Sequence, residues 1–306
     1  MVAAIGFRMY NHSPAMMIAK EKAVIVNADD FGLSEGISEG ILRAATEGIL
    51  TSTTIQANQP LCEKCLRFLK SAPTHLGVGV HLTINGGRPL SIAGQALADE
   101  NGKLSLTASQ TFLTLFKKPS LLAAAEAEFE AQITWALDHG IKPTHLDSHR
   151  HSHAYPPLFK RVVRLAKKYN IPFIRQYGEK FIGEGWPGYD PRNLKAHRIL
   201  NFFGWYVAHR WPSMRGTIGT WGVLQTGRMS AEWLVRAAQA ATQVDGVVEI
   251  MTHPGLTYDL TPQITRMRDS RREELDALTN PAVKEAFHQC GIKLINYRDL
   301  LNFVAT

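Results

Sequence analysis

The sequence predicts an α/β fold, a distorted (β/α)7–8 barrel in which parallel strands alternate with helical crossovers. Short apolar runs alternate with longer helical patterns seven or eight times along the 306 residues. No linker-like change of composition divides the chain, and α/β barrels reach this length as one domain. A doubly wound open sheet is the alternative. Its dinucleotide-binding form loses support because no Gly-x-Gly-x-x-Gly motif follows the first apolar run.

The runs expected to form strands share apolar or β-branched content and a length of three to five residues: 23–27, 51–55, 77–81, 144–147, 171–175, 217–221, 247–251 and 293–295. The segments between them that show helical pattern are 34–48, 60–70, 120–139, 156–169, 195–211, 230–244 and 270–289. All of them except 195–211 begin or end at serine, proline or glycine. Ser34 and Ser230 are the expected N-caps, and a long loop is expected after residue 81.

We expect a single catalytic barrel domain over residues 21–306. Residues 1–20 lack a continuous apolar core with a clear cleavage site and are expected to form a loosely attached N-terminal extension. No apolar run reaches the roughly 18 residues that a membrane span requires. The chain has three cysteines, and this odd and small number fits a reducing cytoplasm. Cys62 and Cys65 form a lone Cys-x-x-Cys pair, which we expect to pack in the protein interior.

The charge balance restricts the partners. The formal net charge of +7 suits an acidic partner or a membrane surface without being diagnostic of either. The sequence has no zinc-finger spacing, RNA-recognition signature or dense basic run, so no nucleic-acid partner is expected. A homo-oligomer is left open. The aromatic and basic segment 197–211 predicts either a barrel helix with snorkelling arginines or a lid or membrane-surface element that receives a glycolipid.

One stretch, THLDSHRHSH from Thr144 to His153, stands out by its histidines. Five potential metal ligands occupy alternate positions: His145, Asp147, His149, His151 and His153. In an extended chain these side chains share one face, which is costly to bury unless something pairs with it. A divalent metal is the simplest partner for imidazole and carboxylate groups. A solvated histidine-rich loop is the alternative.

Polar residues also collect where the expected strands end: Asp29, Asp30, His81, Asp147, His149, Arg175 and His253. In parallel α/β barrels the active site is built at this end of the strands. This clustering is the strongest argument in the sequence for an enzyme.

Asp29 and Asp30 would point to opposite sides of an extended chain, so that one could bind a metal while the other stays free as a base. Two carboxylates that favour a helix N-terminus are the alternative. Glu249 shares a strand face with His253. This face is open to two interpretations. Either Glu249 forms a buried structural salt bridge with Arg175, or His253 is catalytic.

An Asp/His/His metal set with an adjacent carboxylate suits the hydrolysis of an amide such as an N-acetyl group. The metal polarises the carbonyl group, the carboxylate takes the proton of water, and a histidine protonates the leaving amine.

The motifs VNADDFGLS, TSTT, VGVHLT with GGRPL, PTHLDSHRHSH with YPPLF, and EIMTHPG occur in this order. Together they resemble the YdjC-like carbohydrate deacetylases, a group that includes chitooligosaccharide deacetylases and hopanoid-biosynthesis-associated deacetylases. The resemblance covers about residues 22 to 298, and the motifs in combination are highly specific. It implies a barrel similar to that of the polysaccharide deacetylases, and removal of N-acetyl groups from amino sugars, free or attached to larger carriers.

The resemblance also implies roles for individual residues. One divalent metal ion is expected, magnesium by resemblance, although two imidazoles and a carboxylate equally permit zinc. Asp29 matches the general base and His253 the acid or a substrate contact. The residues that match the metal ligands are Asp30, His81 and His149.

The remaining site residues are expected to contact the substrate or to support the ligands from behind: Asp147, His145, His151, Arg175 and Glu249. Asp147 could orient a ligand histidine. Arg150 stands where many members carry histidine or a neutral residue, which could alter contacts with the substrate.

Two other functions remain open at this point. A phosphoesterase would be supported by a second metal at about 3.5–4 Å from the first. A non-catalytic carbohydrate-binding barrel would bind sugar without turning it over.

Overall fold

The structure is a computed structural model that describes residues 22–179, 191–214 and 216–301. The expected N-terminal extension, residues 1–20, lies outside the described residues. None of the described helices is long and apolar enough to cross a lipid bilayer.

In the described part of the chain, eight parallel strands form one sheet: β1 Ala23–Phe31, β2 Ser52–Ile55, β3 Gly77–Leu82, β4 His145–Ser148, β5 Phe173–Ile174, β6 Gly219–Trp221, β7 Val247–Thr252 and β8 Lys293–Leu294. The strands lie in the order β5-β4-β3-β2-β1-β7-β6, with β5 and β6 at the two edges. Neighbours in this order are consecutive in the chain, except that β1 lies beside β7. Short β8 pairs with the beginning of β1. In the described chain no backbone ladder joins β5 to β6, although Thr220 Oγ1 donates a hydrogen bond to Gln176 O at 2.7 Å. The predicted barrel fold is therefore confirmed, as a parallel half-barrel.

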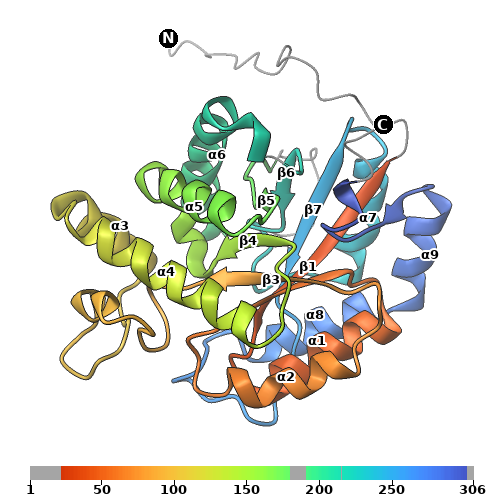
Figure 1. Cartoon of the computed structure of the whole chain (residues 1–306). Coiled ribbons are helices and arrows are strands. Elements are labelled where there is room, and N and C mark those ends of the chain that lie inside the picture. Colours follow the sequence, from red (N-terminus) through yellow and green to blue (C-terminus); the bar gives the residue numbers. More distant parts are fainter. Residues whose placement is uncertain (1–21, 180–190, 215, 302–306) are drawn as a thin grey trace.

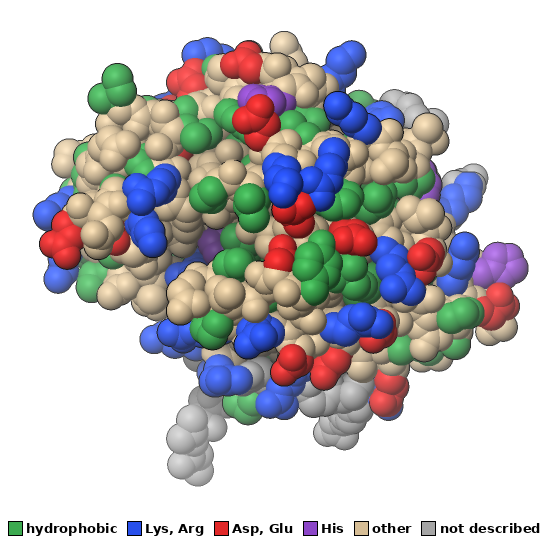
Figure 2. All heavy atoms as spheres, turned by 90° about the horizontal axis from the view of Figure 1, so that it is seen from below, with side chains coloured by type: hydrophobic (Ala, Val, Ile, Leu, Met, Phe, Trp, Pro, Cys, Tyr) green, Lys and Arg blue, Asp and Glu red, His purple; other side chains and the backbone are tan. Residues whose placement is uncertain are grey.

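Helices surround the sheet (Figure 1). Their bounds are α1 Glu35–Glu47, α2 Cys62–Lys70, α3 Ala108–Lys117, α4 Leu121–Asp138, α5 Pro156–Lys168, α6 Asn193–Arg210, α7 Ala231–Ala241, α8 Asp269–Leu278 and α9 Pro281–Gln289. Three short 3-10 turns complete the described elements: η1 Ala93–Leu97, η2 His149–Ala154 and η3 Pro212–Met214. The face seen from below, which includes α1 and α2, carries intermixed acidic and basic side chains (Figure 2).

The helix starts follow local chemistry. The hydroxyls of Ser34 and Ser230 accept hydrogen bonds from the first turns of α1 and α7, as the sequence predicted. Helix α2 begins at Cys62, two residues after the expected Pro60. Helix α3 lies within the segment for which a long loop was expected. Its sequence signal is a capping box formed by Thr107 and Gln110.

Strand β1 is the centre of the architecture, since it pairs with β2, β7 and β8 and is buried throughout. Its side chains alternate between two layers, as a strand requires. Val24 and Val26 pack in the main core with the surrounding helices. Ile25 packs in a separate interior cluster with Phe173 and Tyr297. The same alternation directs the next odd-numbered residues, which are polar, toward the interior of the half-barrel.

Candidate functional site

Asp29 continues the inward alternation of β1 and meets a buried arginine. Arg175, which directly follows β5, binds both oxygens of Asp29 at 2.7 and 2.8 Å. It also contacts Glu249 Oε1 at 2.6 Å and Asp147 Oδ2 at 2.9 Å. We call these four residues the interior network. The predicted Glu249–Arg175 ion pair is confirmed, and it extends to two more carboxylates.

Electrostatics inside the interior network follow from burial and from this pairing. Burial alone would raise the pKa of Asp29, but Arg175 and His81 hold it well below its usual range. Burial alone would lower the pKa of Arg175, but the carboxylates around it raise it well above its usual value. Burial raises the pKa of Glu249, against the opposing effect of Arg175. Asp29 is therefore ionised at neutral pH, and it is paired rather than free.

Asp30 leaves the strand alternation. The β1–β2 register shifts between Ala28 and Phe31, and Asp30 adopts a left-handed backbone with φ of 72°. This conformation is uncommon for a residue other than glycine and occurs most often where a site imposes it. A regular strand would have turned Asp30 toward the helices. The bulge places it instead at the end of the sheet.

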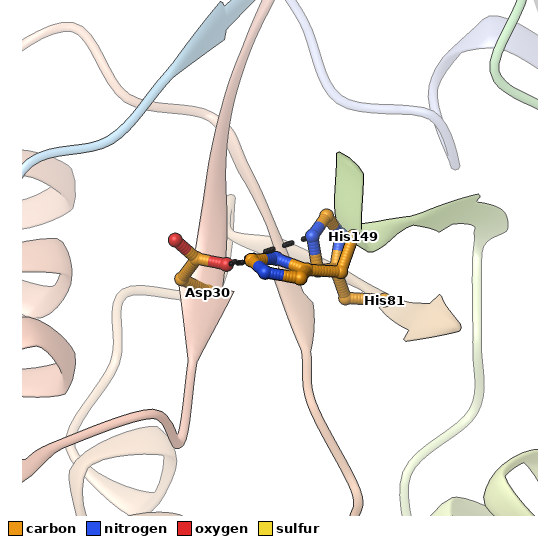
Figure 3. Close-up of side chains that lie close together, drawn as sticks. All are labelled: Asp30, His81 and His149. Atoms are coloured by element: carbon orange, nitrogen blue, oxygen red, sulfur yellow. Dashed lines mark hydrogen bonds and ion pairs between the residues drawn. The ribbon is translucent and has the colours of Figure 1, made fainter. Parts of the chain in front are cut away.

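One carboxylate oxygen of Asp30 faces two histidines (Figure 3). The other oxygen faces an arginine. Asp30 Oδ1 lies 3.1 Å from His149 Nδ1 and 3.6 Å from His81 Nε2. Gln56 Nε2 also contacts this oxygen. Asp30 Oδ2 is held by the guanidinium of Arg271. We call Asp30, His81 and His149 the ligand cluster.

His81 is oriented by its neighbour on the next strand. It stands opposite Asp147 in the β3–β4 register, and its Nδ1 lies 2.8 Å from Asp147 Oδ1. Its Nε2 is thereby directed toward Asp30. Burial alone would lower the pKa of His81, but Asp147 and Asp29, the strongest of its anionic neighbours, raise it to about 9. Asp147 thus orients His81, the ligand-cluster histidine on the neighbouring strand.

The expectation of a single histidine face is wrong beyond His149. Strand β4 ends at Ser148, and Arg150 and His151 adopt left-handed backbone angles with φ of 51° and 59°. An alternating face requires an extended chain, and these two residues turn the chain into η2. Of the histidines in this stretch, His149 joins the ligand cluster.

The other histidines of the stretch have their own partners. His145 is buried and stacks on Tyr297, with ring centroids 3.8 Å apart. His151 Nδ1 lies 2.9 Å from the hydroxyl of Tyr177. His153 contacts Ser148 Oγ at 2.6 Å, and burial lowers its pKa to about 3. Each of these three histidines therefore has a partner within the chain.

His253 follows β7 and lies beside both aspartates. Burial lowers its pKa to about 4, although the nearby carboxylates of Asp29 and Asp30 act in the opposite direction. Its backbone N–H donates a hydrogen bond to Glu274 Oε2 at 2.6 Å. At neutral pH the imidazole is therefore neutral.

Sequence reasoning missed Arg271 and Glu274 of α8 and Gln56 after β2. Arg271 is only 1% exposed, and its Nε and Nη1 have no hydrogen-bond partner among the described residues. Burial raises the pKa of Glu274 to about 7. In the run RREEL these charges resemble a solvated helix face. The usable signal is periodicity, because Arg271 and Glu274 share a helix stripe with buried Leu275 and Leu278.

The donor set fits a divalent metal. Ligand atoms of Asp30, His81 and His149 lie within 4.8 Å of one another, and two imidazoles with one carboxylate suit zinc and related ions. Asp29, His81 and Asp147 meet the same distance limit. Arg175 already binds both of those carboxylates, so the ligand cluster is the better candidate.

A parallel half-barrel with a carboxylate–imidazole cluster at its strand ends defines a barrel protein with a candidate metal centre, an arrangement typical of metal-dependent hydrolases. The sequence model for YdjC-like proteins matches residues 23–289. The chain belongs to the YdjC-like family.

Similar proteins cover nearly the same length. A protein of Clostridium beijerinckii named carbohydrate deacetylase is 32% identical over 279 residues, which is 90% of this chain and 99% of that protein. One of Geobacillus stearothermophilus with the same name is 31% identical, over 90% of this chain and 96% of the relative. The crystal structure of a candidate cellobiose-phosphate cleavage protein from Enterococcus faecalis is 25% identical, with a TM-score of 0.72, and covers 92% of this chain and 99% of its own.

Proposed function

We propose that the protein is a carbohydrate deacetylase that uses one divalent metal ion to hydrolyse the N-acetyl amide of an amino sugar. The name shared by its curated relatives supports the reaction class. The observation that carries the proposal is the convergence of Asp30 Oδ1, His81 Nε2 and His149 Nδ1 beside a second, ionised aspartate.

Asp30, His81 and His149 would hold the metal, and Asp147 would fix the ring of His81 from behind. When bound, the ion supplies Lewis acidity that polarises the amide carbonyl and acidifies water. Family resemblance favours magnesium. The two imidazoles favour zinc, since magnesium prefers oxygen ligands.

Asp29 is the proposed general base. The bidentate contact with Arg175 keeps its carboxylate ionised and fixes its orientation, so it is ready to take a proton from water. Because its pKa lies below the usual range, Asp29 is a weak base, and a stronger base nearby would accept the proton from it. Glu249 contributes indirectly, because it holds the other side of the Arg175 guanidinium.

His253 is the proposed acid or substrate contact. With a pKa of about 4 its imidazole starts neutral and can accept a hydrogen bond from the substrate. To donate a proton to the leaving amine it must first receive one, and Asp29 is the nearby carrier. His151, half-buried and joined to Tyr177, is a further candidate for substrate contact. His145 is buried against Tyr297 and is proposed as structural support.

A two-metal phosphoesterase gains no support from the described residues. The second set of possible ligands, Asp29, His81 and Asp147, shares His81 with the ligand cluster. Both of its carboxylates are paired with Arg175. A non-catalytic sugar-binding barrel would show binding without turnover, which the following test distinguishes.

The decisive measurement is acetate release from diacetylchitobiose, with and without chelator, for the wild type, Asp29→Asn and Asp30→Asn. Removing the base should lower kcat by about 10²–10⁴-fold while metal affinity stays within a few-fold. Asp30→Asn should lose both metal affinity and activity. Thermal midpoints control for folding. Acetate release that survives both chelator and Asp29→Asn would refute the proposal.

A further inference from the structure

Two neighbouring helices expose large apolar side chains. On α6, Ile199, Phe202 and Tyr206 are 39%, 63% and 42% exposed, and their spacing puts them on one side of the helix. On α3, Leu113 and Phe116 are 52% and 71% exposed. Single exposed apolar residues need no explanation, but a group on adjacent helices indicates an interaction site.

The two helices meet through aromatic rings. Phe112 of α3 and Phe203 of α6 have ring centroids 6.2 Å apart, and each ring also packs near Tyr155. Figure 1 shows both helices at the left and upper left of the molecule, away from α1, α2 and α8. We call the exposed side chains of α3 and α6, with their flanking lysines and arginines, the α3–α6 surface.

Both helices carry positive charge and no acidic residue. Helix α3 ends at Lys117, which Lys118 follows, and α6 contains Lys195, Arg198 and Arg210. The face that includes α1 and α2 carries intermixed acidic and basic side chains instead (Figure 2).

We propose that the α3–α6 surface binds the face of an anionic lipid bilayer. Aromatic and aliphatic side chains on a helix rich in lysine and arginine insert at the headgroup level, while the cations are attracted to anionic lipids. A second copy of the chain is a poorer occupant. It would bring an identical positive surface against this one, with no acidic residue on either helix to offset the repulsion.

The surface adjoins the candidate site. Turn η2, which begins at His149, packs against both α3 and α6. Bilayer binding would therefore hold the mouth of the site near the lipid headgroups. The proposal rests on exposure and charge, and it stands independently of the deacetylase activity.

Sedimentation of the full chain with lipid vesicles tests the proposal. Vesicles of phosphatidylcholine alone are compared with an equal mixture of phosphatidylcholine and phosphatidylserine, at low and high salt. The chain should sediment with the mixed vesicles at low salt and be released at high salt. Lys117→Gln and Arg198→Gln should each lower the affinity about fivefold, and Phe116→Ser with Phe202→Ser about tenfold or more.

Lys284→Gln, an exposed lysine on α9, is the matched control and should leave vesicle binding unchanged. Every substituted side chain is exposed, so far-UV circular dichroism should stay the same. Equal binding to both kinds of vesicle, no binding to the mixed vesicles, or an equal loss with Lys284→Gln would overturn the proposal. A lipid-free dimer that Phe202→Ser dissociates would assign the surface to a second copy instead.

Discussion

Asp29 and Asp30 are adjacent in sequence yet belong to regions of different character. Asp29 is part of the interior network, where one permanent cation, Arg175, binds three carboxylates. Asp30 is part of the ligand cluster, where a guanidinium covers one oxygen and two imidazoles face the other. Asp147 joins the regions, with one oxygen on Arg175 and the other on His81.

The comparison shows that adjacent aspartates at the end of one strand can belong to a network of ion pairs and to a candidate metal site. The interior network is held by Arg175, a cation that belongs to the chain itself. The ligand cluster directs imidazole nitrogens at one carboxylate oxygen, and these donors suit an added cation once His81 has lost its proton. The following predictions test this division, beginning with the largest expected effect.

Replacing Arg175 with Met should destabilise the protein by about 3–5 kcal/mol, because three buried carboxylates would lose their cation. Urea unfolding monitored by circular dichroism measures the change. Tyr297→Phe is the milder comparison, since it removes only the 2.7 Å hydrogen bond to Glu249 Oε2 and should cost about 1 kcal/mol. Equal stabilities for Arg175→Met and the wild type would show that the interior network is not held by this residue.

Arg271→Gln should weaken metal binding by about 10–100-fold with a smaller loss of stability than Arg175→Met. Arg271 occupies Asp30 Oδ2, which leaves Oδ1 for the ligand cluster, and partners of this kind set ligand orientation. Calorimetric titration with zinc and with magnesium measures the affinity. The opposite result, tighter binding in the variant, would mean that charge repulsion outweighs orientation.

Metal affinity should rise about tenfold per pH unit between pH 7 and pH 9 and then level off. His81 has a pKa of about 9 in the metal-free protein, so its proton competes with the metal below that pH and is released on binding. Calorimetry in buffers of different ionisation enthalpy counts the proton. An affinity that is flat over this range would show that His81 binds no metal.

Most of the scaffold was predictable because it depends on local patterns. Buried parallel strands appear in the sequence as short apolar runs, and serines mark two of the helix starts. The gathering of Asp30, His81 and His149 was also predictable, since parallel strands end on the same edge of a sheet. The roles assigned to these residues stay predictions until they are tested.

Tertiary structure decided the rest. The alternation of histidines in residues 145–153 predicted that their side chains share one face. The left-handed backbone at Arg150 and His151 interrupts this alternation. That backbone conformation depends on the surrounding fold. Arg271 reaches Asp30 from 241 positions away along the chain. The sequence by itself determined which strand ends carry chemistry, because side-chain alternation and strand direction are local. Long-range packing decided which oxygen of Asp30 faces the imidazoles and which cation neutralises Asp29. Buried charges need partners, and the folded chain supplies them from distant positions in the sequence.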